Sequence, residues 1–102
     1  MRINVPKTKQ IKIIERPMRI YHGYAFPSKL RIEIRSNQTP VEYLGTLVHE
    51  LLHIAFPDMG ESKIDAIARM ITYHLWRQGY RRKGKSQRHR YSRKRTPAEK
   101  ES

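Results

Sequence analysis

The stretch "TPVEYLGTLVHELLHIAFPDMGESKID", residues 39–65, decides how this chain folds. Thr39 is a residue type that caps helix N-termini, Pro40 fits the first helical turn, and Glu42 suits the positive end of the helix dipole. The residues that follow are apolar around most of the helical circumference. We therefore predict a helix from about Pro40 to Phe56 that is buried over most of its surface.

A second helix is predicted directly after the first. "PDMG", residues 57–60, has the composition of a turn, and Asp58 fits turn chemistry. The helix should begin near Glu61, run to about Gln78 and end at Gly79. Its apolar residues recur at helical spacing: Ile64, Ile67, Ala68, Ile71 and Leu75.

Three short segments before the first helix have the composition of strands: Gln10–Glu15, Met18–Phe26 and Lys29–Arg35. The third, "KLRIEIR", alternates aliphatic with charged residues, and its charged side suits an edge strand or a solvated sheet surface. The sequence thus predicts an α+β fold: a small antiparallel sheet of about three strands followed by two packed helices.

The composition limits the possible kinds of protein. A chain of 102 residues with 37% hydrophobic residues suits one domain with one modest core, which we place at residues 1–80. The chain contains no cysteine, so any metal ligands must be His, Asp or Glu. We find neither an apolar run long enough to cross a membrane nor a secretory signal, and we expect a cytoplasmic protein.

Most of the net charge of +13 lies near the C-terminus, where the last 24 residues carry ten Lys/Arg against two Asp/Glu. Residues 81–102 have almost no aliphatic side chains, so we expect a disordered basic tail. Such a tail can bind nucleic acid nonspecifically, or it can simply keep the protein soluble. The candidate phosphate contacts are Arg81, Arg82, Lys83, Lys85, Arg88, Arg90, Arg93, Lys94 and Arg95.

The first helix carries one polar stripe, which holds His49, Glu50 and His53. The i, i+4 spacing of the two histidines sets their imidazoles one turn apart on one face, where they can bind a single Zn²⁺. Glu50 projects beside them and can reach a water on the metal, as a general base must. HExxH can also occur by chance on an amphipathic helix.

A catalytic zinc needs a third protein ligand, and Glu61 at the start of the second helix is the candidate. Asp65 lies one helical turn later and can accept a hydrogen bond from the spare N–H of a ligand histidine. Each residue also has a simpler interpretation. Glu61 can interact favourably with the positive end of the helix dipole, and Asp65 can form a solvent-exposed ion pair with Arg69.

The sequence "HELLH" at residues 49–53, followed by "ESKID" at residues 61–65, resembles the gluzincin arrangement of HExxH and a later ExxxD. The layout of residues 18–80 is similar to the small HExxH metallopeptidases encoded by phages and prophages, which would place the protein in the host cytoplasm. The connection between the motifs is shorter than in thermolysin-like enzymes, and residues 56 and 59 lack the metzincin Gly and His. SprT/Spartan-type DNA-associated proteases are a looser likeness.

The resemblance implies a zinc-dependent peptidase that acts through a zinc-bound water, with Glu50 as general base and a protein or peptide as substrate. In zincins an edge strand binds the substrate, and "KLRIEIR" is the natural candidate. A donor for the carbonyl oxygen is expected among Tyr24, Tyr43, Tyr73 and His74.

We expect the other histidines, His22, His74 and His89, to be ordinary surface residues. The alternative function is a nucleic-acid-binding or virion-associated module whose zinc site is structural or vestigial. A structural site would use both motif histidines and Glu61 but would have no use for Glu50.

Overall fold

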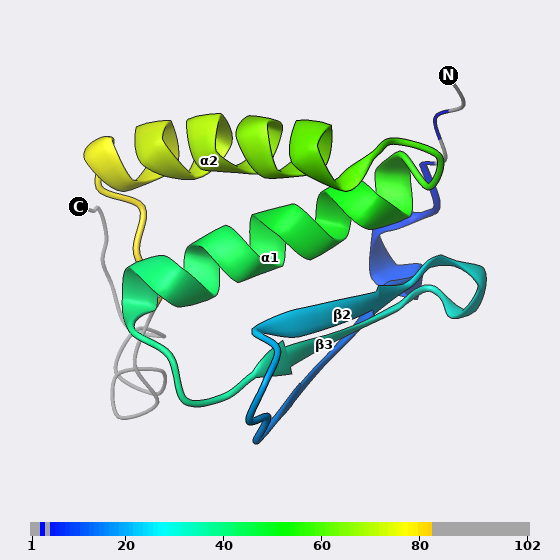
Figure 1. The fold of residues 1–102 in the computed structure, drawn as a ribbon, viewed down its shortest axis with the longest axis horizontal. Coiled ribbons are helices and arrows are strands. Elements are labelled where there is room, and N and C mark those ends of the chain that lie inside the picture. Colours follow the sequence, from blue (N-terminus) through cyan, green and yellow to red (C-terminus); the bar gives the residue numbers. More distant parts are fainter. Residues whose placement is uncertain (1–2, 4, 83–102) are drawn as a thin grey trace.

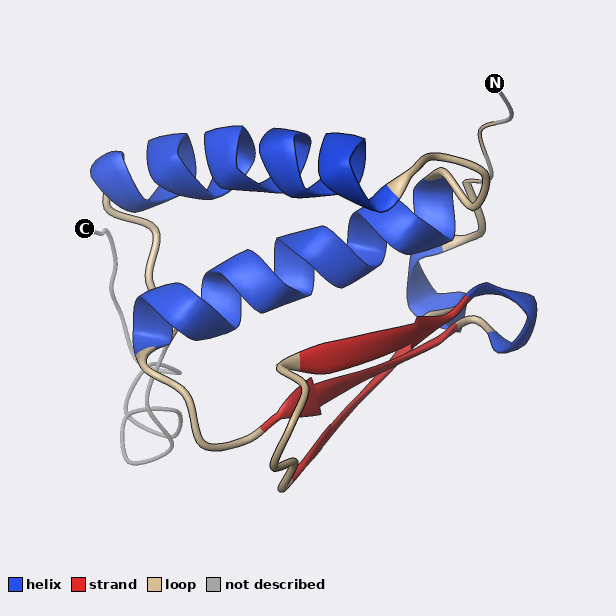
Figure 2. Ribbon diagram, in the orientation of Figure 1, coloured by secondary structure: helices blue, strands red, loops and turns tan. Residues whose placement is uncertain are grey.

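The structure, a computed structural model, describes residue 3 and residues 5–82. Helix α1 (Pro40–Ala55) lies between a three-stranded sheet and helix α2 (Glu61–Arg77), so the molecule has three layers (Figures 1 and 2). The predicted α+β class is confirmed, with two helices close to the expected bounds. Among the described residues, no helix combines the length and the apolarity needed to cross a membrane.

The sheet is mixed, which corrects the prediction of an antiparallel sheet. Strands β1 (Lys12–Arg16), β2 (Gly23–Phe26) and β3 (Arg31–Arg35) lie in the order β1-β3-β2. β2 pairs with β3 antiparallel, whereas β1 pairs with β3 parallel. A short 3₁₀ turn (Pro27–Lys29) joins β2 to β3 closely, so β3 has only its other edge left for β1. Alternation along a strand predicts which face is buried but not the direction of its partner.

Strand β3 forms the centre of the sheet and supplies much of the core. Ile32 and Ile34 are completely buried and pack with Tyr43 and Ile54 of α1. The charged residues of β3 lie on the opposite face, as the alternation predicts. Of the two alternatives for this charged side, an edge strand and a solvated sheet surface, the structure shows the second, because both edges of β3 are paired.

Helix α1 begins where the sequence predicts. The Thr39 hydroxyl accepts a hydrogen bond from the Glu42 amide at 3.3 Å, and the Thr39 amide donates to the Glu42 carboxylate at 3.0 Å. This reciprocal pair satisfies two backbone groups at the helix start. Helix α2 ends just before Gly79, whose φ of 93° is a conformation that glycine adopts without strain.

Arg81 and Arg82, the first two residues of the predicted tail, contact the folded domain. The Arg81 guanidinium stacks over Trp76 at 3.4 Å from the ring centroid. Arg82 lies over the Tyr43 ring at 4.1 Å and forms an ion pair with Glu15, which also accepts a hydrogen bond from the Tyr43 hydroxyl. The predicted disorder and the remaining candidate phosphate contacts (Lys83, Lys85, Arg88, Arg90, Arg93, Lys94 and Arg95) lie outside the described residues, as does His89.

Strand β2 approaches α1 closely because residue 23 is glycine. A Cβ at this position would lie 2.8 Å from the Thr46 methyl carbon, 3.0 Å from the Glu33 carbonyl oxygen and 3.3 Å from Cγ of Glu50. Gly45, in the middle of α1, is different. A Cβ there would meet only Thr72, at an ordinary 3.8 Å.

We expect Gly23→Ala to lower the free energy of unfolding by about 1–3 kcal/mol, since β2 must move away from α1. Gly45→Ala should raise it by roughly 0.5–1 kcal/mol, because alanine is the better helix former and has room. Thermal or urea unfolding of both variants measures these two opposite changes in the free energy of unfolding. Equal stability of the Gly23→Ala variant and the parent would contradict the close approach.

Candidate metal centre

Three side chains from the two helices meet beside the turn that connects them. The His49 Nε2 atom lies 2.7 Å from one carboxylate oxygen of Glu61, and His53 Nε2 lies 2.9 Å from the other. The imidazole centroids of the two histidines are 5.0 Å apart. One potential ligand atom from each residue falls within a group no wider than 4.8 Å, so the three could hold a metal ion.

The spacing of these atoms fits a metal centre after a small adjustment. Ligands on a tetrahedral zinc with bonds of 2.0–2.1 Å lie about 3.3 Å apart. The two His–Glu61 distances are shorter than this, so Glu61 would have to draw back slightly to admit an ion. Its side chain is 70% exposed and has room to do so. The histidines, at 19% and 24% exposure, are held more firmly by the surrounding helices.

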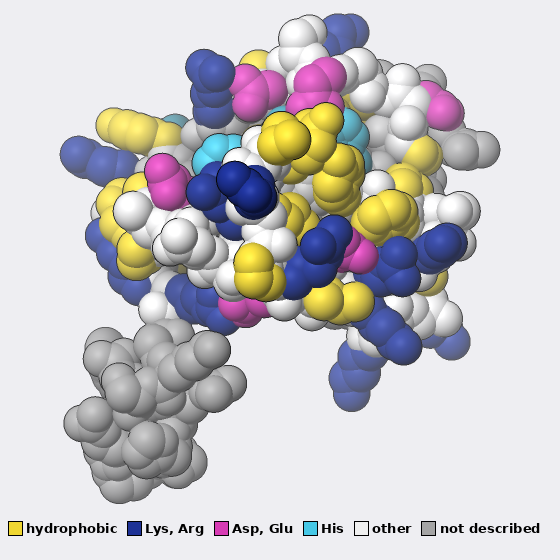
Figure 3. Space-filling model, turned by 60° about the horizontal axis from the view of Figure 1, so that its bottom comes forward, with side chains coloured by type: hydrophobic (Ala, Val, Ile, Leu, Met, Phe, Trp, Pro, Cys, Tyr) yellow, Lys and Arg dark blue, Asp and Glu magenta, His cyan; other side chains and the backbone are white. Residues whose placement is uncertain are grey.

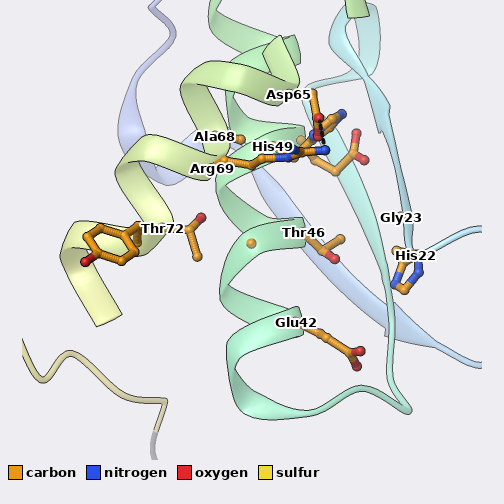
Figure 4. Close-up of a pocket in the computed structure, with 12 residues that line it drawn as sticks. His22, Gly23, Glu42, Thr46, His49, Asp65, Ala68, Arg69 and Thr72 are labelled. Carbon is orange, nitrogen blue, oxygen red and sulfur yellow. Dashed lines mark ion pairs between the residues drawn. The ribbon is translucent and has the colours of Figure 1, made fainter. Parts of the chain in front are cut away.

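Asp65 lies near both partners that the sequence offers it. One of its oxygens is 3.8 Å from His49 Nδ1, and the other forms an ion pair with Arg69 at 2.8 Å (Figure 4). The first distance is longer than a hydrogen bond. Asp65 therefore faces the ring nitrogen that Glu61 leaves unused, while Arg69 holds its carboxylate in place.

Glu50 occupies a different environment from Glu61. It points from α1 toward the start of β2, and only 8% of the residue is exposed. Burial raises the pKa of the Glu50 carboxyl above its ordinary value, the nearby His49 lowers it, and Glu61 raises it again. A buried carboxyl with a raised pKa next to potential metal ligands is the kind of group that enzymes use for proton transfer.

A cleft of about 720 Å³ opens beside His49, which alone of the three potential ligands lines it. It runs along α1 between α2 and the start of β2, and it reaches the candidate metal centre at His49 and at Asp65 beside it (Figure 4). Its lining consists of His22, Gly23, Glu42, Gly45, Thr46, His49, Glu50, Asp65, Ala68, Arg69, Thr72 and Tyr73.

A small hydrogen-bonded network orients His22 at the wall of this cleft. The Gln38 side-chain amide donates to the Arg35 carbonyl at 2.8 Å, so its oxygen faces the other way. That oxygen lies 2.9 Å from His22 Nδ1 and accepts from the Thr46 hydroxyl at 3.0 Å. Because an amide oxygen only accepts, Nδ1 of His22 carries hydrogen, and Nε2 is the nitrogen left for another partner.

The sequence did not single out His22, which lies 27 residues before His49. The one feature of the sequence that pointed to His22 was the neighbouring Gly23, which allows the chain to approach α1. Of the four residues expected to supply a carbonyl-oxygen donor, Tyr73 lines the cleft. Tyr43 is bonded to Glu15, Tyr24 lies on the sheet, and His74 is exposed on α2 with its ring against Tyr73.

Comparison of the chain with known protein families, with curated proteins and with solved structures gave no match.

We expect Zn²⁺ added to metal-free protein to bind with one ion per chain, measured by titration calorimetry and elemental analysis. His53→Ala should weaken this binding by more than about 100-fold, since losing a ligand costs more than losing one of its outer partners. His74→Ala, which removes an exposed imidazole from α2, is the matched control and should bind like the parent. Equal weakening in both variants would show that the histidines bind zinc nonspecifically.

Proposed function

We propose that this protein is a zinc-dependent peptidase in which Glu50 is the general base. The observation that carries the proposal is the position of the Glu50 carboxylate. It is buried in the wall of the cleft beside His49, the one of the three potential metal ligands that also lines this cleft. A centre that only stabilised the fold would not need a second, buried carboxylate next to its ligands.

Two imidazoles and one carboxylate form a donor set that suits zinc and leaves a fourth position open. A zinc ion held there would supply Lewis acidity toward a carbonyl oxygen and make a water more acidic. The Glu50 carboxylate, with its raised pKa, would take a proton from the attacking water and pass it to the leaving amine. Asp65 would help to orient the His49 ring through Nδ1.

The geometry favours β2 over β3 as the strand that binds substrate. β2 is an edge strand, its first residue lies against Thr46 and Glu50, and that residue lines the cleft. An extended peptide could pair with the free edge of β2 and so bring its backbone to Glu50. Gly23 keeps this end of the strand close enough to α1 for the purpose.

Tyr73 and His22 both line the cleft and are candidates for contacting the substrate backbone. The Tyr73 hydroxyl can donate a hydrogen bond to the carbonyl oxygen, whereas His22 in its neutral form, with its hydrogen on Nδ1, offers Nε2 as an acceptor for a backbone N–H. His22 comes from the turn before β2 and Tyr73 from α2, so they approach the cleft from its two walls. The Gln38 network already holds the ring of His22, which lowers the cost of ordering it when substrate binds.

The resemblance of residues 49–65 to gluzincins supports the same proposal independently of the cleft. The alternative, a nucleic-acid-binding or virion-associated module with a structural or vestigial zinc site, shares His49, His53 and Glu61 with the peptidase. The two differ at Glu50, which only the enzyme requires.

We expect Glu50→Gln to retain one bound zinc and the parent's thermal stability, yet to lower hydrolysis of an unstructured protein such as casein by about 10²–10⁴-fold. The change keeps the shape of the side chain and removes its ability to take a proton. Glu42→Gln is the matched control. Glu42 lies on the same helix, lines the same cleft and is exposed, and glutamine still fits its capping role.

Undiminished hydrolysis by the Glu50→Gln protein would show that Glu50 is not the general base. Absence of hydrolysis in the parent, with zinc bound, would instead favour the structural alternative.

A further inference from the structure

We propose that the face of the sheet that turns away from α1 binds single-stranded nucleic acid. The bases would stack on a row of aromatic side chains, and the phosphates would contact the Lys and Arg side chains around it. This site does not involve the metal centre or the residues after Arg82, and it does not depend on the proposed peptidase activity.

The register of the strands determines which side chains share this face. Directly paired residues point to the same side of a sheet. Ile32 and Ile34 face α1, so Arg31, Glu33 and Arg35 face outward. Their partners on the flanking strands therefore also face outward: Lys12, Ile14 and Arg16 of β1, and Tyr24 and Phe26 of β2.

Three aromatic rings form a row along β2. The centroids of Tyr21 and Tyr24 are 4.8 Å apart, and those of Tyr24 and Phe26 are 6.1 Å apart. Tyr21 is 52% exposed and Tyr24 is 39% exposed, values that are high for rings packed on a sheet. Rings exposed in this way on an open sheet are where proteins stack unpaired bases.

The charge on this face is strongly positive and close to the rings. Four cations face outward (Lys12, Arg16, Arg31 and Arg35) against one carboxylate, Glu33. Arg16 and Arg31 lie 2.8 and 3.5 Å from the Glu33 oxygens, so this carboxylate is already neutralised. The Arg31 guanidinium lies 4.7 Å from the Phe26 ring centroid, where it could contact a phosphate beside a stacked base.

Figure 3 brings this side of the molecule forward and shows hydrophobic side chains near its centre with Lys and Arg side chains around them. The combination of exposed hydrophobic and cationic side chains favours single-stranded nucleic acid as the ligand of this face. A second copy of the chain would bring two positive faces together, which is unfavourable. A duplex would hide its bases from the rings, whereas a single strand offers both unstacked bases and phosphates.

The first test is fluorescence anisotropy of the full chain with labelled oligo-dT and oligo-U of 12 nucleotides, alongside a duplex of equal length. Tyr24→Ala should weaken binding of the single strand by about 5- to 150-fold, the loss of one stacked base. Tyr73→Ala removes a tyrosine that is even more exposed, at 58%, from α2 on the far side of α1, and this variant should bind nucleic acid like the parent. The ratio of the dissociation constants for oligo-dT and oligo-U shows whether the preferred single strand is DNA or RNA.

The second test separates this face from the overall basic charge of the chain. The double variant Lys12→Gln/Arg16→Gln and its control Lys63→Gln/Arg77→Gln, both altered only at exposed positions, lose the same net charge. If the sheet face makes the contacts, Lys12→Gln/Arg16→Gln should make the slope of log K against log salt less steep by about 1.4, or about 0.7 per phosphate contact. The control should leave the slope unchanged.

Equal effects of the two double variants would overturn the proposal, because they would assign binding to total charge. Duplex binding as tight as single-strand binding, with no effect of Tyr24→Ala, would also overturn it. Sedimentation showing a dimer that Tyr24→Ala dissociates would identify a second copy as the occupant instead. Zinc content and thermal stability, measured on every variant, confirm that the fold is intact, and the charge variants remain informative if Tyr24→Ala does not fold.

Discussion

Helix α1 lies between the sheet and α2, and after Glu42 each of its residues is buried or half-buried. Most of its residues are therefore apolar; of the polar ones, Thr46 and Glu50 are themselves buried, and His49 and His53 are half-buried. The turn after α1 folds α2 back along it, and the first residue of α2, Glu61, then meets both imidazoles. Burial between two layers thus limits the motion of the histidines while leaving Glu61 free to adjust.

The parts of the structure that depend on neighbouring residues could be predicted from the sequence. Thr39 and Glu42 define the start of α1 because a reciprocal cap needs only residues three apart. The spacing of His49 and His53 fixes their common face, because the helix itself sets it. Glu61 could be predicted as their partner because the connection is short enough to leave α2 few alternatives to packing back on α1.

The parts that depend on distant contacts could not be predicted. Alternation in β3 gave its buried face, but the parallel pairing with β1 depends on the path of the chain through residues 17–22, which carry no directional signal. His22 lines the cleft only because β2 lies against α1 at Gly23, a contact between segments far apart in the sequence. The contacts of Arg81 and Arg82 with Trp76, Tyr43 and Glu15 could likewise not be predicted, because both arginines belong to a basic segment of nearly uniform composition.

X-ray absorption spectroscopy of the zinc-loaded protein tests most directly whether His49, His53 and Glu61 bind one cation. We expect a shell of four nitrogen or oxygen neighbours at about 2.0–2.1 Å, with the outer-sphere scattering of two imidazoles. In the Glu61→Gln protein, that shell should change while both imidazole signals remain. A six-coordinate spectrum with no imidazole scattering, or one identical in the Glu61→Gln protein, would contradict binding by these three residues.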